Sequence, residues 1–576
     1  MNLWDKVQLG AQFARAGLAW WRRDTAYPSP VPHNPRFKSP RDAVRLIRDG
    51  DVLAISGLGA HQRAAILYWA IGERFDATGH PADLTVINLG GHGGRGFAPG
   101  TIEELARPGL CTRLISSHFE TMPAFMDRAA AGDCTIHCVP LGVIALLYDA
   151  LAHGRDTLLT TTGVGTFLDP RTGRGSPLSD GTEEQLVTPA GTRLRYRIPK
   201  PDVVIFNLPA ADRRGNLYAT HAAMIGDSAE LACAARRNGG RVIANVGRLD
   251  EPGTAPVFLA ADLVDAVVFH PDTEQTGAVF HRAPWVDITP DSPAPIARGL
   301  ERVRFVNSLA PTIPRRSAAD LALGRLGAAT LLNQVPAGAS VSIGTGLPEE
   351  VCAAVHAHGL LDRVTFLVES GTVGGLPVPG AYFGAALNPQ RIVSPATLFK
   401  RCARRLDAAC LGALQVDEHG NVNVSKRGEG LAHYVGPGGF IDFTEAARTI
   451  IFVTSWMHRG AVAVDDGRIR IVRRGAPKFV ERVDEVTFDA PRALRAGKRV
   501  WYVTHVGVFR LTARGVELAA VMPGIDVRRD IVHVARGRIV LPRSGRVPRL
   551  PRALVTGDAL PLDRGWPAGL SARAAR

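Results

Sequence analysis

Cysteine, lysine and long apolar runs are all scarce in this sequence of 576 residues. The seven cysteines are scattered and form no Cys-x-x-Cys pair, which argues against a disulfide framework and favours free thiols in a reducing cytosol. No apolar stretch reaches the roughly 20 residues of a membrane-spanning helix. Charged residues from Asp5 to Arg23 interrupt the first segment, which excludes a signal peptide. We therefore expect a cytoplasmic protein without an integral membrane segment.

Positive charge dominates, and arginine supplies nearly all of it. The formal net charge is +14, and seven of the 68 basic residues are lysines. The charge is spread along the chain, and no zinc pattern or RNA-binding signature accompanies it. We interpret the excess as a compositional bias toward arginine, with no nucleic-acid partner, no metal site and no tightly bound cofactor.

The chain is too long for one compact core, and its apolar content of 46% is that of a packed protein. From about residue 40, short apolar runs such as Val52–Ile55 and Val203–Asn207 alternate with helix-like stretches such as Ala64–Phe75. Alternating strands and helices predict an α/β fold with mainly parallel sheets flanked by helices. The proline-rich segment 285–315 is expected to be a linker.

The two halves of the sequence resemble each other in three places. The matching pairs are Asp49–Gly59 with Ala337–Leu347, Leu84–Gly94 with Val364–Gly374, and Ala211–Tyr218 with Val416–Asn423. Three correspondences in the same order indicate a duplication. We predict two similar open α/β domains fused in one chain, over residues 40–310 and 316–540.

Both ends of the chain lie outside these domains. Residues 1–39 form an amphipathic extension that carries Trp4, Trp20 and Trp21. Such a helix docks on its own protein or on a partner subunit more often than on a membrane surface. Residues 541–576 form a tail rich in proline and arginine, which we expect to be flexible or loosely packed.

Glu369 is the strongest candidate for chemistry. It follows the apolar strand Val364–Val368, and a glycine-rich segment comes next. Catalytic groups of parallel sheets lie at the carboxyl ends of strands, where a partly desolvated carboxylate acts as a nucleophile or base. The equivalent residue of the first half is Leu89, so the repeated strand does not need an acid to fold. The alternative is a glutamate that only caps a tight turn.

Several motifs carry a family resemblance. They are FLVESGTVGGLPVPGAYFGAALNP at Phe366–Pro389, GVGTFLDPR at Gly163–Arg171, QVDEHGNVNVS at Gln415–Ser425 and GPGGF at Gly436–Phe440. Together they resemble the family I CoA transferases, and most closely the single-chain propionate or acetoacetate CoA-transferase type. The resemblance covers roughly residues 40–530. It implies an α-type first domain, a β-type second domain and a homo-oligomer, either a dimer or a tetramer.

The resemblance also implies a reaction. Glu369 would be the nucleophile of a ping-pong transfer that passes through an acyl-glutamyl anhydride and a glutamyl-CoA thioester. Coenzyme A would be a co-substrate, with an acyl-CoA as donor and a carboxylic acid as acceptor. An acyl-CoA hydrolase that uses the same glutamate, and a non-catalytic CoA-binding or metabolite-binding protein, remain as alternatives.

Further site residues follow from the same resemblance. Beside Glu369, the candidates for stabilising an oxyanion are Gly438, Gly439 and Asn423, with Asn423 preferred over Asn421. The candidates for contacting CoA or substrate are Gly344, Gly346, Gly374, Gly375 and Asn421. For the glycines, ordinary turn formation is the competing explanation.

The sequence departs from the family in two places. Relatives carry three glycines where this chain has Ala403, Arg404 and Arg405, and a glutamine where it has Leu141. One hypothesis is that Arg404 or Arg405 binds the free carboxylate of an acidic acyl group, because arginine pairs bidentately with carboxylates. The alternative is that both arginines face solvent on a helix.

Overall fold

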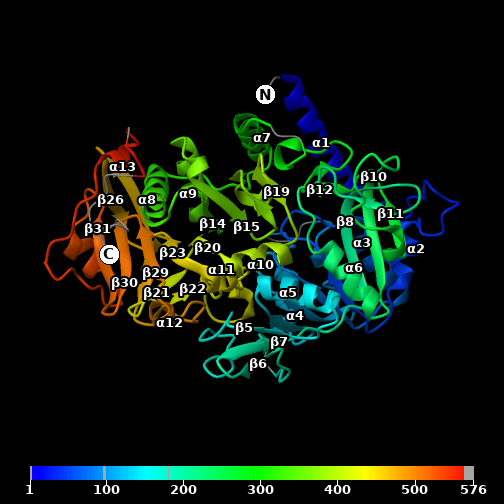
Figure 1. Cartoon of the computed structure of the whole chain (residues 1–576), viewed down its shortest axis with the longest axis horizontal. Helices are drawn as coiled ribbons and strands as arrows, with labels where there is room; N and C mark the ends of the chain where they lie inside the picture. The colour runs from blue at the N-terminus through cyan, green and yellow to red at the C-terminus, as the bar shows by residue number, and fades with distance from the viewer. Residues whose placement is uncertain (1–2, 95–98, 180, 292–293, 559, 564–576) are drawn as a thin grey trace.

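The computed structural model describes residues 3–94, 99–179, 181–291, 294–558 and 560–563. The first half of the chain builds an eight-stranded sheet, on the right of Figure 1. Its order is β11 (Ala266–Phe269), β10 (Arg241–Leu249), β8 (Val203–Ala211), β1 (Val52–Ile55), β2 (Leu84–Asn88), β3 (Cys111–Ser116) and β4 (Thr135–Cys138), with β9 (Leu217–Tyr218) paired to β8. All pairs in this order are parallel, and the β8–β9 pair is antiparallel.

The second half builds a nine-stranded sheet. Its order is β19 (Arg391–Ile392), β16 (Thr372–Val373), β15 (Val364–Val368), β14 (Ala339–Ile343), β20 (Leu406–Leu411), β23 (Ala447–Val453), β29 (Arg499–Thr504), β30 (Gly507–Thr512) and β31 (Gly515–Val521). The central strands β15, β14, β20, β23 and β29 are parallel, and antiparallel strands extend the sheet at both ends.

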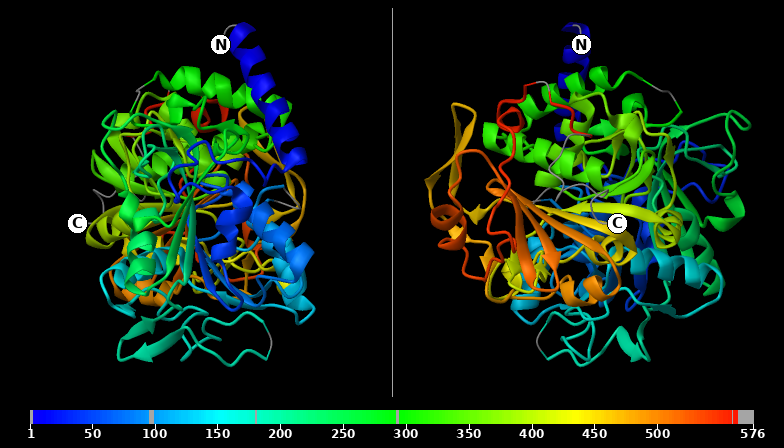
Figure 2. Two further views of the ribbon diagram at one scale, coloured as in Figure 1. Left: turned by 90° about the vertical axis from the view of Figure 1, so that its right-hand side faces the viewer. Right: turned by 60° about the vertical axis from the view of Figure 1, so that its left-hand side comes forward.

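Helices connect the strands and pack beside the sheets (Figures 1 and 2). Those of the first half are α3 (Ala65–Thr78), α4 (Pro123–Ala130), α5 (Leu141–Ala152) and α6 (Ser228–Arg237), and those of the second are α8 (Ala318–Gln334), α9 (Leu347–Ala357), α10 (Pro395–Arg404) and α11 (Phe440–Ala446). A three-stranded sheet of β5 (Leu158–Thr160), β7 (Arg193–Tyr196) and β6 (Val187–Ala190) lies at the lower edge in Figure 1. The predicted α/β class with two similar, mainly parallel sheets is confirmed; the domain bounds stay a prediction.

The third repeated segment forms the same turn in both halves. In the first half, the Asp212 carboxylate accepts hydrogen bonds from the backbone N–H groups of Arg214 and Asn216 and from the Asn216 side chain, at 2.8 to 3.0 Å. In the second half, the Asp417 carboxylate accepts the equivalent bonds from His419 and Asn421, at 2.9 to 3.0 Å. The duplication inferred from sequence therefore extends to individual hydrogen bonds.

The N-terminal helix α1 (Leu3–Arg22) projects from the body of the molecule, as Figure 2 shows. Its later part is docked on its own chain: Trp20 donates a hydrogen bond from Nε1 to Glu274 Oε1 at 3.2 Å, and Phe13 and Trp20 pack against Phe280. Its outer face remains exposed, with Trp4 at 67% of its full accessible surface. Docking on its own protein was the first of the two predicted alternatives.

Two segments that the sequence predicts to be irregular contain ordered structure. The supposed linker at 285–315 contains the helix α7 (Ile296–Leu309), because its prolines all lie outside that range. The described part of the tail is also packed rather than loose. Its short helix α13 (Ala553–Thr556) buries Leu554 and Val555, and Arg325 of α8 donates hydrogen bonds to the carbonyls of these two residues at 2.7 and 2.8 Å. Apolar residues between the prolines and arginines provide this contact.

Candidate active site

Glu369 lies at the carboxyl end of β15, the third strand from one side of the nine-stranded sheet. The neighbouring strand β14 is parallel to it, with Ser342 opposite Leu367. The side chain of Glu369 is partly buried, whereas Ser370 behind it is fully buried and donates a hydrogen bond from its hydroxyl to the Gly384 carbonyl. The backbone after the strand is therefore fixed, and the partly buried side chain of Glu369 lies at the carboxyl edge of the sheet.

Gly439 holds the carboxylate of Glu369 in place. Its backbone N–H donates a hydrogen bond to Glu369 Oε2 at 3.0 Å. A Cβ atom at position 439 would lie 2.5 Å from the same oxygen, so any larger residue would displace the carboxylate. Gly439 lies just before α11, and its φ of −85° is open to any residue. Glycine is therefore needed here for space and not for backbone conformation.

Two aromatic rings form an apolar wall at this position. Phe399 and Phe443 are stacked, with ring centroids 5.1 Å apart, and both would contact a Cβ atom on Gly439. Burial beside these rings raises the pKa of Glu369 to about 7, while the hydrogen bond from Gly439 acts in the opposite direction. A carboxylate of raised pKa is more nucleophilic than an ordinary glutamate and is still substantially ionised at neutral pH.

Asp442 is a second carboxyl group at the site, and the sequence interpretation missed it. Its Oδ2 accepts a hydrogen bond from the backbone N–H of Gly142 in the first half at 2.9 Å. Burial raises the pKa of Asp442 to about 8, and the nearby charge of Glu369 adds to the rise. Both pKa values are raised toward neutral pH, and the charge of an ionised Glu369 opposes ionisation of Asp442.

The loop that carries Gly439 is bonded to the first half of the chain. The N–H of Phe119 bonds to the carbonyl of Val435 at 2.8 Å, and the N–H of Leu141 bonds to the carbonyl of Gly438 at 3.1 Å. In the other direction, the N–H of Gly438 bonds to the carbonyl of Ser117 at 2.9 Å. The site therefore requires both halves, although its carboxylates come from the second.

These bonds revise two predicted roles. The N–H of Gly438 is already paired with Ser117, so this residue lies beside Glu369 without offering a free donor. Asn423 donates from its side-chain nitrogen to Gln415 Oε1 and the Lys426 carbonyl, at 2.8 and 2.7 Å. Its amide hydrogens are thus used within its own loop, and the preference for Asn423 as an oxyanion donor is not supported.

Asn421 also has a structural role. It bonds to Asp417 and accepts a hydrogen bond from the N–H of Ala490 at 2.9 Å. In the first half, where Leu89 is the equivalent of Glu369, Asn216 bonds to Asp212 and accepts a hydrogen bond from the N–H of Ala261 at 3.0 Å. The same bonds occur in the first half, where Leu89 and not an acidic residue follows the equivalent strand β2. These asparagine bonds therefore stabilise the turn and do not indicate a ligand site.

The remaining predicted glycines divide into two groups. Gly374 and Gly375 have positive φ angles, and added Cβ atoms would meet the Gln390 side chain at 2.6 Å and the Leu387 carbonyl at 2.4 Å. These two glycines allow the segment to pack closely against residues 387–390, which agrees with ordinary turn formation. Gly344 and Gly346 follow β14, beside Glu369 at the same edge of the sheet. A Cβ atom on Gly346 would meet no atom of the described residues within 4 Å, so this loop faces open space.

Arg404 and Arg405 lie at the opposite edge of the sheet from Glu369, a placement that does not support the hypothesis that they bind the acyl group. They precede β20, whose Ala408 lies opposite Val341 of β14. They therefore flank the amino ends of the strands, whereas Glu369 lies at the carboxyl ends. The two edges are separated by about four residues, or roughly 13 Å along a strand. Both arginines are exposed at the end of α10, in agreement with the alternative interpretation.

The other departure from the family does lie at the site. Leu141 is fully buried at the start of α5 and bonds through its N–H to Gly438. In the described ranges, no group of three or more His, Cys, Asp or Glu residues is arranged to hold a metal ion. Among the helices that the structure describes, none is both long and apolar enough to cross a bilayer.

Comparison with known proteins agrees with this architecture. The coenzyme A transferase family model matches residues 37–270. A caffeate CoA-transferase from Acetobacterium woodii is 31% identical over 518 residues, which cover 86% of this chain and 93% of that protein. The acetate CoA-transferase YdiF from Escherichia coli O157:H7 is 28% identical over 511 residues, which cover 86% and 90%.

The fold is shared as well. A crystal structure of acyl-CoA transferase YdiF from Escherichia coli O157:H7, described as a thioester complex with CoA, matches with a TM-score of 0.80 at 26% identity. The match covers 94% of this chain and 99% of that one. The molecule is thus an enzyme of the transferase class built from two similar α/β domains. The chain belongs to the coenzyme A transferase family.

Proposed function

We propose that the chain is an acyl-CoA:carboxylate CoA-transferase in which Glu369 is the nucleophile. The observation that carries this proposal is the placement of the Glu369 carboxylate, at the carboxyl end of β15 and bonded to the N–H of Gly439 at 3.0 Å. The names of the relatives differ in the acid, caffeate in one and acetate in the other. The proposal therefore covers carboxylic acids as a class. A cytoplasmic location and a homo-oligomeric state stay predictions.

The first half of the reaction transfers CoA to the enzyme. With Oε2 held by Gly439, Oε1 of Glu369 attacks the thioester carbonyl carbon of the acyl-CoA. The C–S bond breaks, which leaves an acyl-glutamyl anhydride and CoA thiolate. The thiolate then attacks the glutamyl carbonyl carbon and releases the first acid as its carboxylate. A glutamyl-CoA thioester remains, and no net proton is consumed.

Gly439 has a specific task in this sequence. In both covalent intermediates, Oε2 is the carbonyl oxygen of the modified Glu369, and negative charge develops on it whenever its carbon is attacked. The N–H that bonds to Oε2 in the free enzyme is therefore already placed to stabilise this oxyanion. The loop Gly344–Gly346 is the candidate to contact the acyl-CoA. A second acid reverses the steps, takes the CoA and restores the carboxylate.

Intact-protein mass spectrometry tests this proposal. After incubation with acetyl-, propionyl-, acetoacetyl- or succinyl-CoA, we expect at least one donor to add the mass of CoA to the chain, less one water. An added carboxylic acid should remove the adduct and appear as a new acyl-CoA. CoA release that proceeds without any acceptor would identify a hydrolase instead. Tight CoA binding with neither adduct nor turnover would identify a binding protein.

The two raised pKa values predict the pH dependence of the reaction. As pH rises through about 7, Glu369 ionises and kcat/KM for the acyl-CoA should increase. As pH rises through about 8, Asp442 ionises, and a second negative charge then opposes attack by Glu369 and oxyanion formation. We expect kcat/KM to fall again above this value, so the profile should be bell-shaped.

Asp442→Asn separates these two effects. The asparagine retains an oxygen that can accept the hydrogen bond from Gly142, but it cannot ionise. We expect this variant to keep the rise near pH 7 and to lose the fall at higher pH. The measurement is kcat/KM from pH 5.5 to about 9.5, the range that brackets both groups. A variant that is inactive at pH 7, although folded, would mean that the ionised form of Asp442 takes part.

A further inference from the structure

Helix α10 presents a cationic face at the amino edge of the second sheet. The side of the helix that carries Ala396, Leu398, Phe399 and Cys402 is buried. The opposite side carries Thr397, Lys400, Arg401 and Arg404, at the spacing that places residues on one helical face. The segment TLFKRCARR, residues 397–405, thus places four exposed polar side chains on one face within two helical turns.

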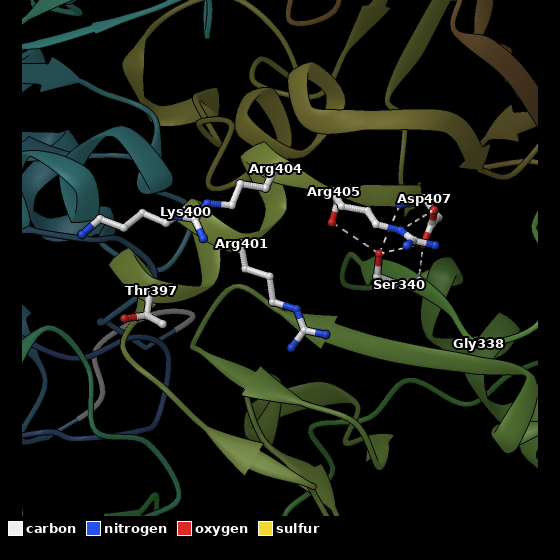
Figure 3. Close-up of a pocket in the computed structure, with 8 residues that line it drawn as sticks. All are labelled: Gly338, Ser340, Thr397, Lys400, Arg401, Arg404, Arg405 and Asp407. Carbon is white, nitrogen blue, oxygen red and sulfur yellow. Dashed lines mark hydrogen bonds and ion pairs between the residues drawn. The ribbon is translucent and has the colours of Figure 1, made fainter.

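This face borders a cavity of about 570 Å³, a size common for small-ligand sites. The residues that line it are Gly338, Ser340, Thr397, Lys400, Arg401, Arg404, Arg405 and Asp407. Four of these side chains are cationic, and one is a carboxylate. Figure 3 shows them around the ends of α10 and β14, with dashed contacts only among Arg405, Ser340 and Asp407.

The lining carboxylate does not neutralise the cavity. Asp407 accepts hydrogen bonds from the N–H and hydroxyl of Ser340 at 2.9 and 3.0 Å, and it pairs with Arg405 at 3.4 Å. Lys400 reaches out to Asp149 of α5 at 2.5 Å. Across the described parts of the chain, no carboxylate pairs with Arg401 or Arg404.

Uncompensated cations at this spacing repel one another. Arg401 and Arg404 are three residues apart on α10, where like charges destabilise a helix. Basic residues in the last turn do favour the carboxyl end of a helix. That effect accounts for charge near the helix end, but not for a cavity lined by four cations. A bound anion would offset the repulsion.

We propose that this cavity is a binding site for a small phosphate-bearing polyanion, separate from the site at Glu369. Arginine recognises phosphate through two parallel hydrogen bonds, and the hydroxyl of Thr397 supplies a further polar group. The cavity lies at the amino ends of β14 and β20, whereas the nucleophile lies at the carboxyl end of β15. The cavity and the nucleophile therefore lie at opposite edges of the same sheet.

Titration calorimetry with pyrophosphate at low ionic strength tests the site. We expect one site per chain in the wild type. The double variant Arg401→Ala with Arg404→Ala should weaken binding about tenfold or more, because two charge-assisted contacts are lost. The matched control, Arg470→Ala with Arg473→Ala on the exposed hairpin of β25 (Ala461–Asp465) and β26 (Arg468–Arg473), removes the same charge and should bind as the wild type does.

Three results would overturn the proposal. If pyrophosphate binding were weakened equally in both double variants, the effect would come from the overall charge of the protein and not from this cavity. Binding of long polyanions such as heparin, with none of pyrophosphate, would exclude a small-ligand site. A raised KM for acyl-CoA in the α10 variant would place the cavity within the CoA site. Glu369→Gln should bind pyrophosphate normally, which keeps this test independent of the proposed reaction. Arg404→Ala alone serves if the double variant does not fold.

Discussion

Glu369→Gln should lower kcat for CoA transfer by about 10⁴-fold or more, as removal of a covalent nucleophile does in other enzymes. The amide is nearly the same size, and its oxygen can still accept the hydrogen bond from Gly439. Binding of CoA should therefore persist, while the covalent CoA adduct should disappear from the mass spectrum. The measurements are steady-state transfer between an acyl-CoA and an acid, and adduct formation with the same donor.

The matched control is Glu103→Gln in the first half. Glu103 is a buried carboxyl whose pKa burial raises to about 7, as at Glu369, and its Oε1 accepts a hydrogen bond from the N–H of Ala124 at 3.0 Å. We expect this variant to transfer CoA at close to the wild-type rate. Comparable losses in both variants would mean that any buried glutamate matters, and the role assigned to Glu369 would fail.

Folding of the Glu369→Gln variant can be checked by its stability. Because burial raises the pKa of Glu369 from 4.5 to about 7, the unfolded chain loses this proton at lower pH than the folded chain does. Ionisation therefore destabilises the folded state as pH rises above 4.5, and the penalty levels off above about 7. The glutamine variant lacks this ionisation penalty. At pH 8 its free energy of unfolding should exceed that of the wild type by about 1–3 kcal/mol, a range that allows for partial solvent screening.

Gly439→Ala should lower kcat by about 100-fold, the scale of loss expected when a reacting group is displaced by about 1 Å. The new Cβ atom would lie 2.5 Å from Glu369 Oε2, so the carboxylate has to move. The N–H of residue 439 and its backbone conformation are retained, since φ is −85°. We expect the unfolding midpoint to change little, because the end of a flexible side chain can give way.

The control for this substitution is Gly17→Ala in α1. Its Cβ atom would meet nothing within 4 Å among the described residues, and alanine favours a helix. It should leave kcat unchanged. A Gly439→Ala variant with wild-type kcat would show that the contact with Glu369 does not position the nucleophile.

The sequence predicts the parts of this enzyme that depend on local pattern. The position of Glu369 follows from an apolar strand and the glycines after it, and the repeat follows from segments that keep their order. For Asn421, the repeat itself argues against a role at the site, because it aligns this residue with Asn216 in the half whose equivalent of Glu369 is Leu89. That equivalence by itself indicates a turn-forming residue.

Other features depend on contacts between distant segments. Asp442 becomes a site residue because Gly142, three hundred positions earlier, donates a hydrogen bond to it. The N–H of Gly438 is not free because it donates a hydrogen bond to the carbonyl of Ser117. Arg404 lies far from Glu369 because α10 ends at the amino end of β20, at the opposite edge of the sheet. No periodicity or motif spacing encodes these pairings, since they arise when the two halves pack together.

The backbone bonds between the loop of Gly438 and the first half have a thermodynamic consequence. The main apolar core also runs without a break through residues of both halves, from Leu53 to Val503. Neither half can open without removing partners from the other, so partly unfolded forms with one intact half should be sparsely populated. An interface of this kind makes two duplicated domains behave as one cooperative unit, and the geometry around Glu369 persists as long as that unit is folded.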